Sequence, residues 1–216
     1  MPLKPRIGLL AGDPTGIGPE IAAKLLAMPE TLRQAEVVLI GDRRSVGDGA
    51  AEGLKLVELP LDSPPTLGKL SREAGAYTLA SLRRAVETIR RGEIDALVFA
   101  PLNKQAMKLA GLEQEDEMHY FAHLLRFTGL CSEINIAVTD TVNLWTTRVT
   151  SHVPLRAVAD LITEQAVFDA ILLLDRTMRA ARPAPPRLAV AGLNPHAGEG
   201  GLLGTEEIEI IQPAVE

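Results

Sequence analysis

The stretch that decides the fold is Arg6-Ile-Gly-Leu-Leu-Ala-Gly-Asp-Pro-Thr-Gly-Ile-Gly-Pro-Glu20. Its first part is a short apolar run ended by a glycine, which is typical of a strand covered on both faces. Pro19 then suits the first turn of a helix. The spacing of Gly12, Gly16 and Gly18 does not make the GxGxxG fingerprint of dinucleotide-binding turns. The turn is therefore either a tight structural connection or a loop that faces a ligand.

Three further apolar runs have the same character: Val37–Ile40, Ile94–Ala100 and Arg187–Ala191. Apolar residues recur at helical spacing over Ser71–Arg91 and Thr163–Ala181. This alternation predicts an α/β fold with a mostly parallel sheet and helices on both faces.

Two runs depart from the alternation. Glu133–Val138 and Val142–Val149 are separated by only three residues, which predicts a β-hairpin. We place a change of subdomain just before it, so that residues 1–130 form a first α/β subdomain and residues 131–216 a second.

Composition excludes some classes of function. The net charge of -6 and the low aromatic content of 3% argue against a nucleic-acid partner, because such binding needs clustered basic groups and stacking rings. No apolar stretch reaches the ~20 residues of a membrane-spanning helix, and the chain begins almost at once with a predicted strand. Cys131 is the single cysteine, which suits a reducing compartment. We expect a cytoplasmic protein in which Cys131 is a buried thiol.

Two histidines lie in loops that follow apolar runs. His152 is in Thr150-Ser-His-Val-Pro-Leu155, and His196 is in Gly192-Leu-Asn-Pro-His-Ala-Gly-Glu-Gly-Gly201. Loops at the ends of strands in an open α/β sheet deliver side chains to a ligand crevice, so we expect both imidazoles to hold one divalent metal. Imidazole ligation suits zinc, cobalt, nickel or manganese. Asn194 can donate to or accept from a substrate, and Thr205 is expected to cap a following helix.

Other candidates have open alternatives. Lys104 follows a predicted strand and could hold an anionic substrate group, although an exposed lysine is the default interpretation. His119 and His123 are four residues apart on one helix face, which is compatible with a second metal pair but is weak evidence on spacing alone.

Four motifs resemble the 4-hydroxythreonine-4-phosphate dehydrogenase family, in the same order and over the whole chain: Gly12–Glu20, Ala100–Lys104, Ser151–Leu155, and Gly192–Gly201 followed by Gly204–Glu207. The resemblance implies an isocitrate/isopropylmalate dehydrogenase-like fold with two subdomains and a role in pyridoxine biosynthesis. It also implies a homodimer with sites at the subunit interface, NAD as oxidant, and a divalent metal (Zn, Mg, Mn, Co or Ni) held by three histidines. His152 and His196 match two of these three.

Two departures from the family stand out. The chain stops at Glu216, before the segment that would supply the third histidine, so we expect the second subdomain to be incomplete relative to the family. Where the family contacts substrate through Gly-His-Thr-Glu, this chain has Asp116-Glu117-Met118-His119. Glu117, Met118 and His119 are thus candidate substrate-binding residues, but a carboxylate and a thioether replace a pair that would donate to phosphate.

We therefore expect metal- and NAD-dependent oxidation, with decarboxylation, of a hydroxy acid resembling 4-phosphohydroxy-L-threonine. His152 and His196 would be metal ligands, and Lys104 and Asn194 substrate contacts; the sequence identifies no general base. One alternative is a dehydrogenase of a non-phosphorylated diol or dicarboxylate, such as a terephthalate dihydrodiol. Another is a non-catalytic homologue that kept the scaffold.

Overall fold

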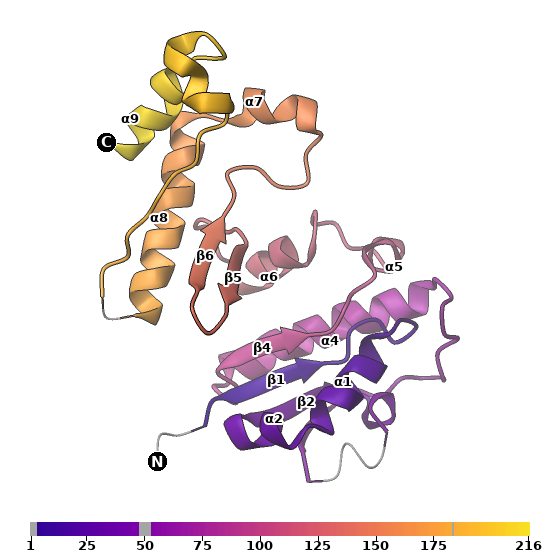
Figure 1. The fold of residues 1–216 in the computed structure, drawn as a ribbon. Coiled ribbons are helices and arrows are strands. Elements are labelled where there is room, and N and C mark those ends of the chain that lie inside the picture. Colours follow the sequence, from indigo (N-terminus) through magenta and orange to yellow (C-terminus); the bar gives the residue numbers. More distant parts are fainter. Residues whose placement is uncertain (1–3, 48–52, 183) are drawn as a thin grey trace. The chain divides into compact units, whose positions relative to one another are not determined.

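The computed structural model describes residues 4–47, 53–182 and 184–216 (Figure 1). The chain divides into two compact units, Met1–Phe127 and Thr128–Glu216, and each is described by itself. None of the helices in the described ranges is both long and apolar enough to cross a membrane.

The first unit is built on a four-stranded parallel sheet. Its strands are β1 (Arg6–Leu10), β2 (Glu36–Gly41), β3 (Lys55–Glu58) and β4 (Ala96–Phe99), in the spatial order β3-β2-β1-β4. The three strands predicted in this region are confirmed, and so is their parallel direction. Strand β3 was not predicted, because its four residues are too few to give a clear pattern.

Helices cover both faces of this sheet, as predicted (Figure 1). Alternate strand residues point to opposite faces, so Leu9 and Leu39 pack with α1 (Gly18–Leu26), while Leu10 and Ile40 pack with α4 (Arg72–Arg90). The shorter helices are α2 (Pro29–Gln34), α5 (Lys104–Leu109) and α6 (Glu117–Leu125). These two layers give the unit its core.

The turn after β1 is tied down by backbone hydrogen bonds. The backbone N–H of Asp13 donates to the carbonyl of Pro101 at 3.0 Å, and the N–H groups of Thr15 and Gly16 both donate to Asp13, at 2.9 and 3.1 Å. Gly12 has φ +79, and a Cβ there would lie 2.5 Å from the Pro101 oxygen. The N–H groups of Asp13, Thr15 and Gly16 therefore have partners within the protein.

The second unit contains the predicted hairpin and the second long helix. Strands β5 (Ile134–Val138) and β6 (Asn143–Thr147) pair antiparallel, and α8 (Glu164–Ala181) begins after Thr163, whose side chain caps it. Ile162, Val167 and Ala214 form the core of this unit. Its remaining elements are short: η2 (Leu155–Ala157), α7 (Val158–Leu161), η3 (Pro195–Gly201), η4 (Glu207–Ile211) and α9 (Gln212–Val215).

Two expectations for the second unit were wrong. Arg187–Ala191 is not a strand, because no segment in the described part of the chain pairs with it to form a ladder. Cys131 is exposed and not buried, since it lies in irregular chain between α6 and β5.

Candidate functional site

Both histidine loops belong to the second unit, and the segments that lead into them line one cavity of about 280 Å³. Val149 and Thr150 precede His152, and Gly192 and Leu193 precede His196. Two loops far apart in the sequence are thus brought together at their stems. The prediction that both loops leave a parallel sheet was wrong, because His152 follows the antiparallel strand β6 and no strand lies directly before His196 in the described residues.

The two histidines share an unusual backbone. His152 has φ 56 and His196 has φ 52, and both side chains are exposed. Residues other than glycine rarely adopt this left-handed region, which costs of order 1–3 kcal/mol for each and is found most often at functional sites. Among the described non-glycine residues, only Arg126, Ala197 and Glu199 share this region with the two histidines, and the last two belong to the His196 loop itself.

Around His196 the left-handed conformation continues for five residues. The φ angles from His196 to Gly200 are 52, 51, 75, 44 and 68. Three of these residues carry side chains, so the turn costs roughly 3–6 kcal/mol at 1–2 kcal/mol each. Gly198 is required, because a Cβ there would lie 2.5 Å from the carbonyl oxygen of Gly204.

Two carboxylates hold the segment before this turn. Glu207 accepts the backbone N–H groups of Leu193 and Asn194 at 2.7 and 2.6 Å. The Asn194 amide donates to Glu206 at 2.7 Å and to Glu207 at 2.9 Å. Hydrogen bonds from the Asn194 backbone and side chain hold the pKa of Glu207 below its usual value.

The role of Glu206 and Glu207 was not predicted, because the prediction for this segment was only a helix capped by Thr205. That helix is present, but Thr205 does not cap it through its side chain. The Thr205 hydroxyl donates instead to Glu209 at 3.0 Å. A pair of acids directly after a glycine-rich histidine loop was the available signal.

The donor set fits a divalent metal in part. Exposed imidazoles are suitable ligands, but no group of three or more His, Cys, Asp or Glu side chains within the described ranges could hold a metal ion. A protein site normally supplies at least three ligands. Metal bound by His152 and His196 would therefore need a further ligand from outside the described residues.

The candidate substrate residues of the first unit form a separate cluster. Lys104 begins α5, and its ammonium lies 3.6 Å from Glu117 Oε2, at the first residue of α6. This carboxylate oxygen is buried and makes no hydrogen bond within the described part of the chain. Met118 is half-buried beside it. Lys104 is consequently the charge that compensates Glu117.

Asp116 and His119 pair with each other at the start of α6. The Asp116 carboxylate accepts the backbone N–H of His119 at 2.9 Å and contacts its Nδ1 at 2.7 Å. Burial acts to raise the pKa of Asp116, but the bonds from His119 outweigh it and lower this pKa. His123, also on α6, is exposed. The cluster is therefore rich in carboxylates, with Lys104 as the compensating cation.

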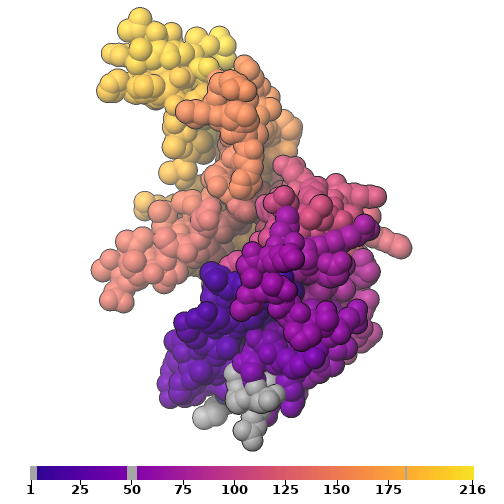
Figure 2. All heavy atoms as spheres, turned by 90° about the vertical axis from the view of Figure 1, so that its right-hand side faces the viewer, coloured from indigo at the N-terminus to yellow at the C-terminus, as the bar shows by residue number. Residues whose placement is uncertain are grey.

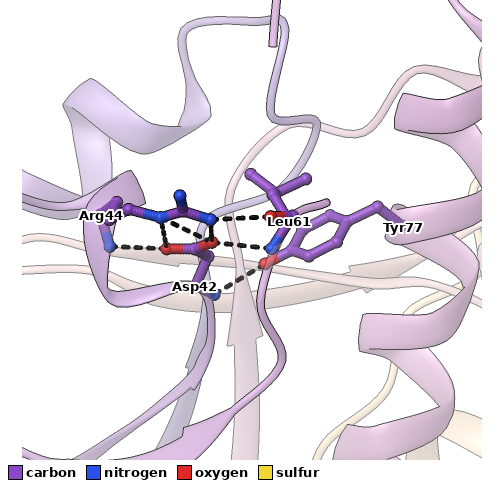
Figure 3. A network of polar contacts seen from close by, with 4 residues as sticks. All are labelled: Asp42, Arg44, Leu61 and Tyr77. Atoms are coloured by element: carbon purple, nitrogen blue, oxygen red, sulfur yellow. Dashed lines mark hydrogen bonds and ion pairs between the residues drawn. The ribbon is translucent and has the colours of Figure 1, made fainter. Parts of the chain in front are cut away.

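A larger cavity of about 700 Å³ lies after the carboxyl ends of β1 and β3, lined by Pro14, Thr15, the segment 59–66 and α4. One wall is fixed by the network in Figure 3. Asp42 accepts the N–H of Leu61 at 2.7 Å and pairs with the Arg44 guanidinium at 2.5 Å. Tyr77 accepts the Asp42 N–H at 2.8 Å, and burial raises the pKa of Tyr77 to about 12.

Replacing Asp42 should destabilise this unit. The Arg44 guanidinium is the main cause that lowers the pKa of Asp42 from 3.8 to about 2. Asp42→Asn should cost about 2 kcal/mol, because bonds to an ionised and buried acceptor are lost. The pKa of Asp42 is lower in the folded than in the unfolded protein. The difference in the free energy of unfolding between the parent protein and Asp42→Asn should therefore reach its full value above about pH 4 and decline toward pH 2. Urea unfolding measures this difference, and Asp62→Asn, at an exposed position, is the control. Equal stability of Asp42→Asn and the parent protein would contradict the stabilising role of Asp42.

Two solved structures show the class of protein to which this fold belongs. A solved 4-hydroxythreonine-4-phosphate dehydrogenase from Klebsiella pneumoniae is similar over 99% of this chain and 70% of its own, with a TM-score of 0.84 and 32% identity. A terephthalate 1,2-cis-dihydrodiol dehydrogenase from Burkholderia xenovorans is similar over 99% and 69%, with a TM-score of 0.61 and 26% identity. The predicted dehydrogenase-like α/β fold is confirmed.

The family follows from the sequence comparisons. A family model described as "Pyridoxal phosphate biosynthetic protein PdxA" matches residues 12–216. A Pseudomonas aeruginosa protein provisionally named 4-hydroxythreonine-4-phosphate dehydrogenase 2 is 38% identical over 100% of this chain and 69% of its own length. A Symbiobacterium thermophilum protein provisionally named D-threonate 4-phosphate dehydrogenase is 36% identical over 100% and 70%. The chain belongs to the PdxA family, whose relatives named here are dehydrogenases.

Proposed function

We propose that the protein oxidises the secondary alcohol of a hydroxy acid resembling 4-phosphohydroxy-L-threonine, with NAD as oxidant and a divalent metal at His152 and His196. The observation that carries the proposal is the shared cavity beneath the two histidine loops, which brings their stems together in one unit. The names of the relatives support a phosphorylated hydroxy acid as substrate.

Each residue has a proposed role. His152 and His196 offer ring nitrogens to the metal, and Asn194 offers its side-chain oxygen to substrate, because its amide nitrogen is bonded to Glu206 and Glu207. A bound divalent metal would supply Lewis acidity at the substrate alcohol. NAD would accept the hydride, and we assign no described residue to it. The β-keto acid formed would then lose carbon dioxide.

A second candidate is the same oxidation of a substrate without phosphate. The observation in its favour is Lys104 paired with Glu117. A phosphate that recruited Lys104 would leave the buried Glu117 oxygen without its compensating charge.

We also propose a cytoplasmic homodimer, on the family resemblance. The hairpin, salmon in Figure 2, supports an interface between copies, since Ile136 and Val138 lie on one face of β5 and are 51% and 66% exposed within the single chain. Apolar side chains grouped in this way are typical of surfaces that another protein covers.

NADH formation by the full-length protein tests the proposal. We expect activity with 4-phosphohydroxy-L-threonine or an unphosphorylated hydroxy acid, loss of that activity after chelation, and its recovery with zinc, cobalt, manganese, nickel or magnesium. Activity that is unchanged by complete metal removal would contradict the metal role. No NADH with any of these substrates and metals would favour a non-catalytic homologue.

A further inference from the structure

The carboxylate of Glu207 is bonded on both of its oxygens to the segment that enters the His196 turn. Oε1 accepts the backbone N–H groups of Leu193 and Asn194 at 2.7 and 2.6 Å, and Oε2 accepts the Asn194 amide at 2.9 Å. All three donors lie two or three residues before His196. Glu207 therefore fixes the direction in which the chain enters the left-handed turn.

The same carboxylate also lies close to the backbone of Gly192 and of Gly198 within the turn. A Cβ at Gly198 would lie 3.0 Å from Glu207 Oε2, and one at Gly192 would lie 3.2 Å from Oε1. The carboxylate thus lies between the incoming chain and the turn itself, and its removal would take away the hydrogen bonds to Leu193 and Asn194 and leave a gap beside Gly198.

Glu206 completes the arrangement by accepting the same Asn194 amide at 2.7 Å. Carboxylates only accept hydrogen bonds, so the nitrogen of Asn194 must face them and its oxygen must face elsewhere. Two carboxylates hence determine which polar atom of Asn194 is left for other contacts.

We propose that Glu207 is a positioning residue that holds the left-handed backbone at His196 and so presents the imidazole to its ligand. The inference rests on the proposed function in one respect, that His196 binds a divalent metal. Such outer partners of a metal ligand commonly change affinity by 10–100-fold.

The test compares Glu207→Ala, Glu207→Gln and Glu209→Gln in the full-length protein. Glu209 is a matched control, because it lies on the same segment and bonds only to Thr205 among the described contacts. In the metal-free protein we expect hydrogen exchange at the Leu193 and Asn194 amides to rise at least tenfold in Glu207→Ala. We also expect the NMR signals of the His196 ring to shift. Glu207→Gln should be intermediate, since its oxygen can still accept the backbone groups, and Glu209→Gln should match the parent protein.

Titration with Co²⁺ gives the second readout. We expect about 10–100-fold weaker binding in Glu207→Ala, a smaller loss in Glu207→Gln and no change in Glu209→Gln. If Glu207→Ala does not fold, Glu207→Gln carries the comparison.

The outcomes separate the inference from the proposed function. Unchanged amide exchange and unchanged His196 ring signals would overturn the inference, whatever the metal does. Faster exchange with unchanged Co²⁺ affinity would also overturn it, provided that His196→Ala abolishes binding. If His196→Ala binds Co²⁺ as the parent does, the metal role fails. The shift of the His196 ring signals in metal-free Glu207→Ala then decides the inference alone.

Discussion

His196→Ala is expected to lower kcat/KM for alcohol oxidation by about 10²–10⁴ and to weaken Co²⁺ binding in parallel. The reason is that the imidazole is proposed to bind the metal. It lies on a left-handed turn whose conformation is stabilised by the bonds between Glu207 and Asn194 and by the lack of a side chain at Gly198. Metal polarisation of a substrate oxygen contributes several kcal/mol, and each 1.4 kcal/mol is tenfold in rate. Steady-state kinetics and Co²⁺ titration measure the two effects.

His152→Ala should behave like His196→Ala, because a metal that loses either ligand loses most of its function. The double variant should be little worse than each single one, since residues that act as a unit are not additive. His123→Ala is the control, as this exposed histidine of α6 has no proposed role. Activity losses in the two loop variants without any loss of Co²⁺ affinity would contradict shared ligation.

The second candidate function, oxidation of a substrate without phosphate, predicts that the protein prefers an unphosphorylated hydroxy acid over its phosphorylated counterpart by about two to four orders of magnitude in kcat/KM. Glu117 and Met118 replace two donors, and each lost charge-assisted bond costs roughly 1.5–3 kcal/mol. At 1.4 kcal/mol per tenfold, two such losses give this range. Lys104 compensates Glu117 at 3.6 Å and Asp116 adds a further carboxylate, so a phosphate here would meet like charges without a cation of its own.

Variants of the same loop test the cause of this preference. Glu117→Gln should raise kcat/KM for the phosphorylated substrate at least tenfold, because it removes a like charge and releases Lys104. Exposed Glu113→Gln is the matched control and should change nothing. A parent protein that strongly prefers the phosphorylated compound would show that Lys104 or His119 binds phosphate and that our interpretation of Glu117 is wrong.

Much of the fold could be predicted because its signals are local. The apolar runs at β1, β2 and β4 carry the pattern of doubly covered strands, and the capping residues Ser71 and Thr163 mark the starts of α4 and α8. The predicted strand at Arg187–Ala191 was wrong because a strand exists only with a neighbour, and apolar character does not supply one. The exposure of Cys131 likewise depends on the irregular segment around it.

The candidate site could be predicted only in part. Glycine and proline around His196 indicate an unusual loop, but the hydrogen bonds that hold the chain entering it join Leu193 and Asn194 to Glu206 and Glu207, which lie 12 to 14 positions further along the sequence. The pairing of Lys104 with Glu117 joins two helices and has no signature in either motif alone. The sequence motifs identified His196, Lys104 and Glu117 as candidates. The side chains that contact them could be identified only in the folded chain.

The most direct test of the central claim is the anomalous diffraction of crystals of the full-length protein grown with Zn²⁺ or Co²⁺. The account predicts one metal peak with ring nitrogens of His152 and His196 both at about 2.0–2.2 Å. It would be contradicted by a metal that contacts only one of the two, or by imidazoles more than about 8 Å apart, because one metal cannot bridge that separation.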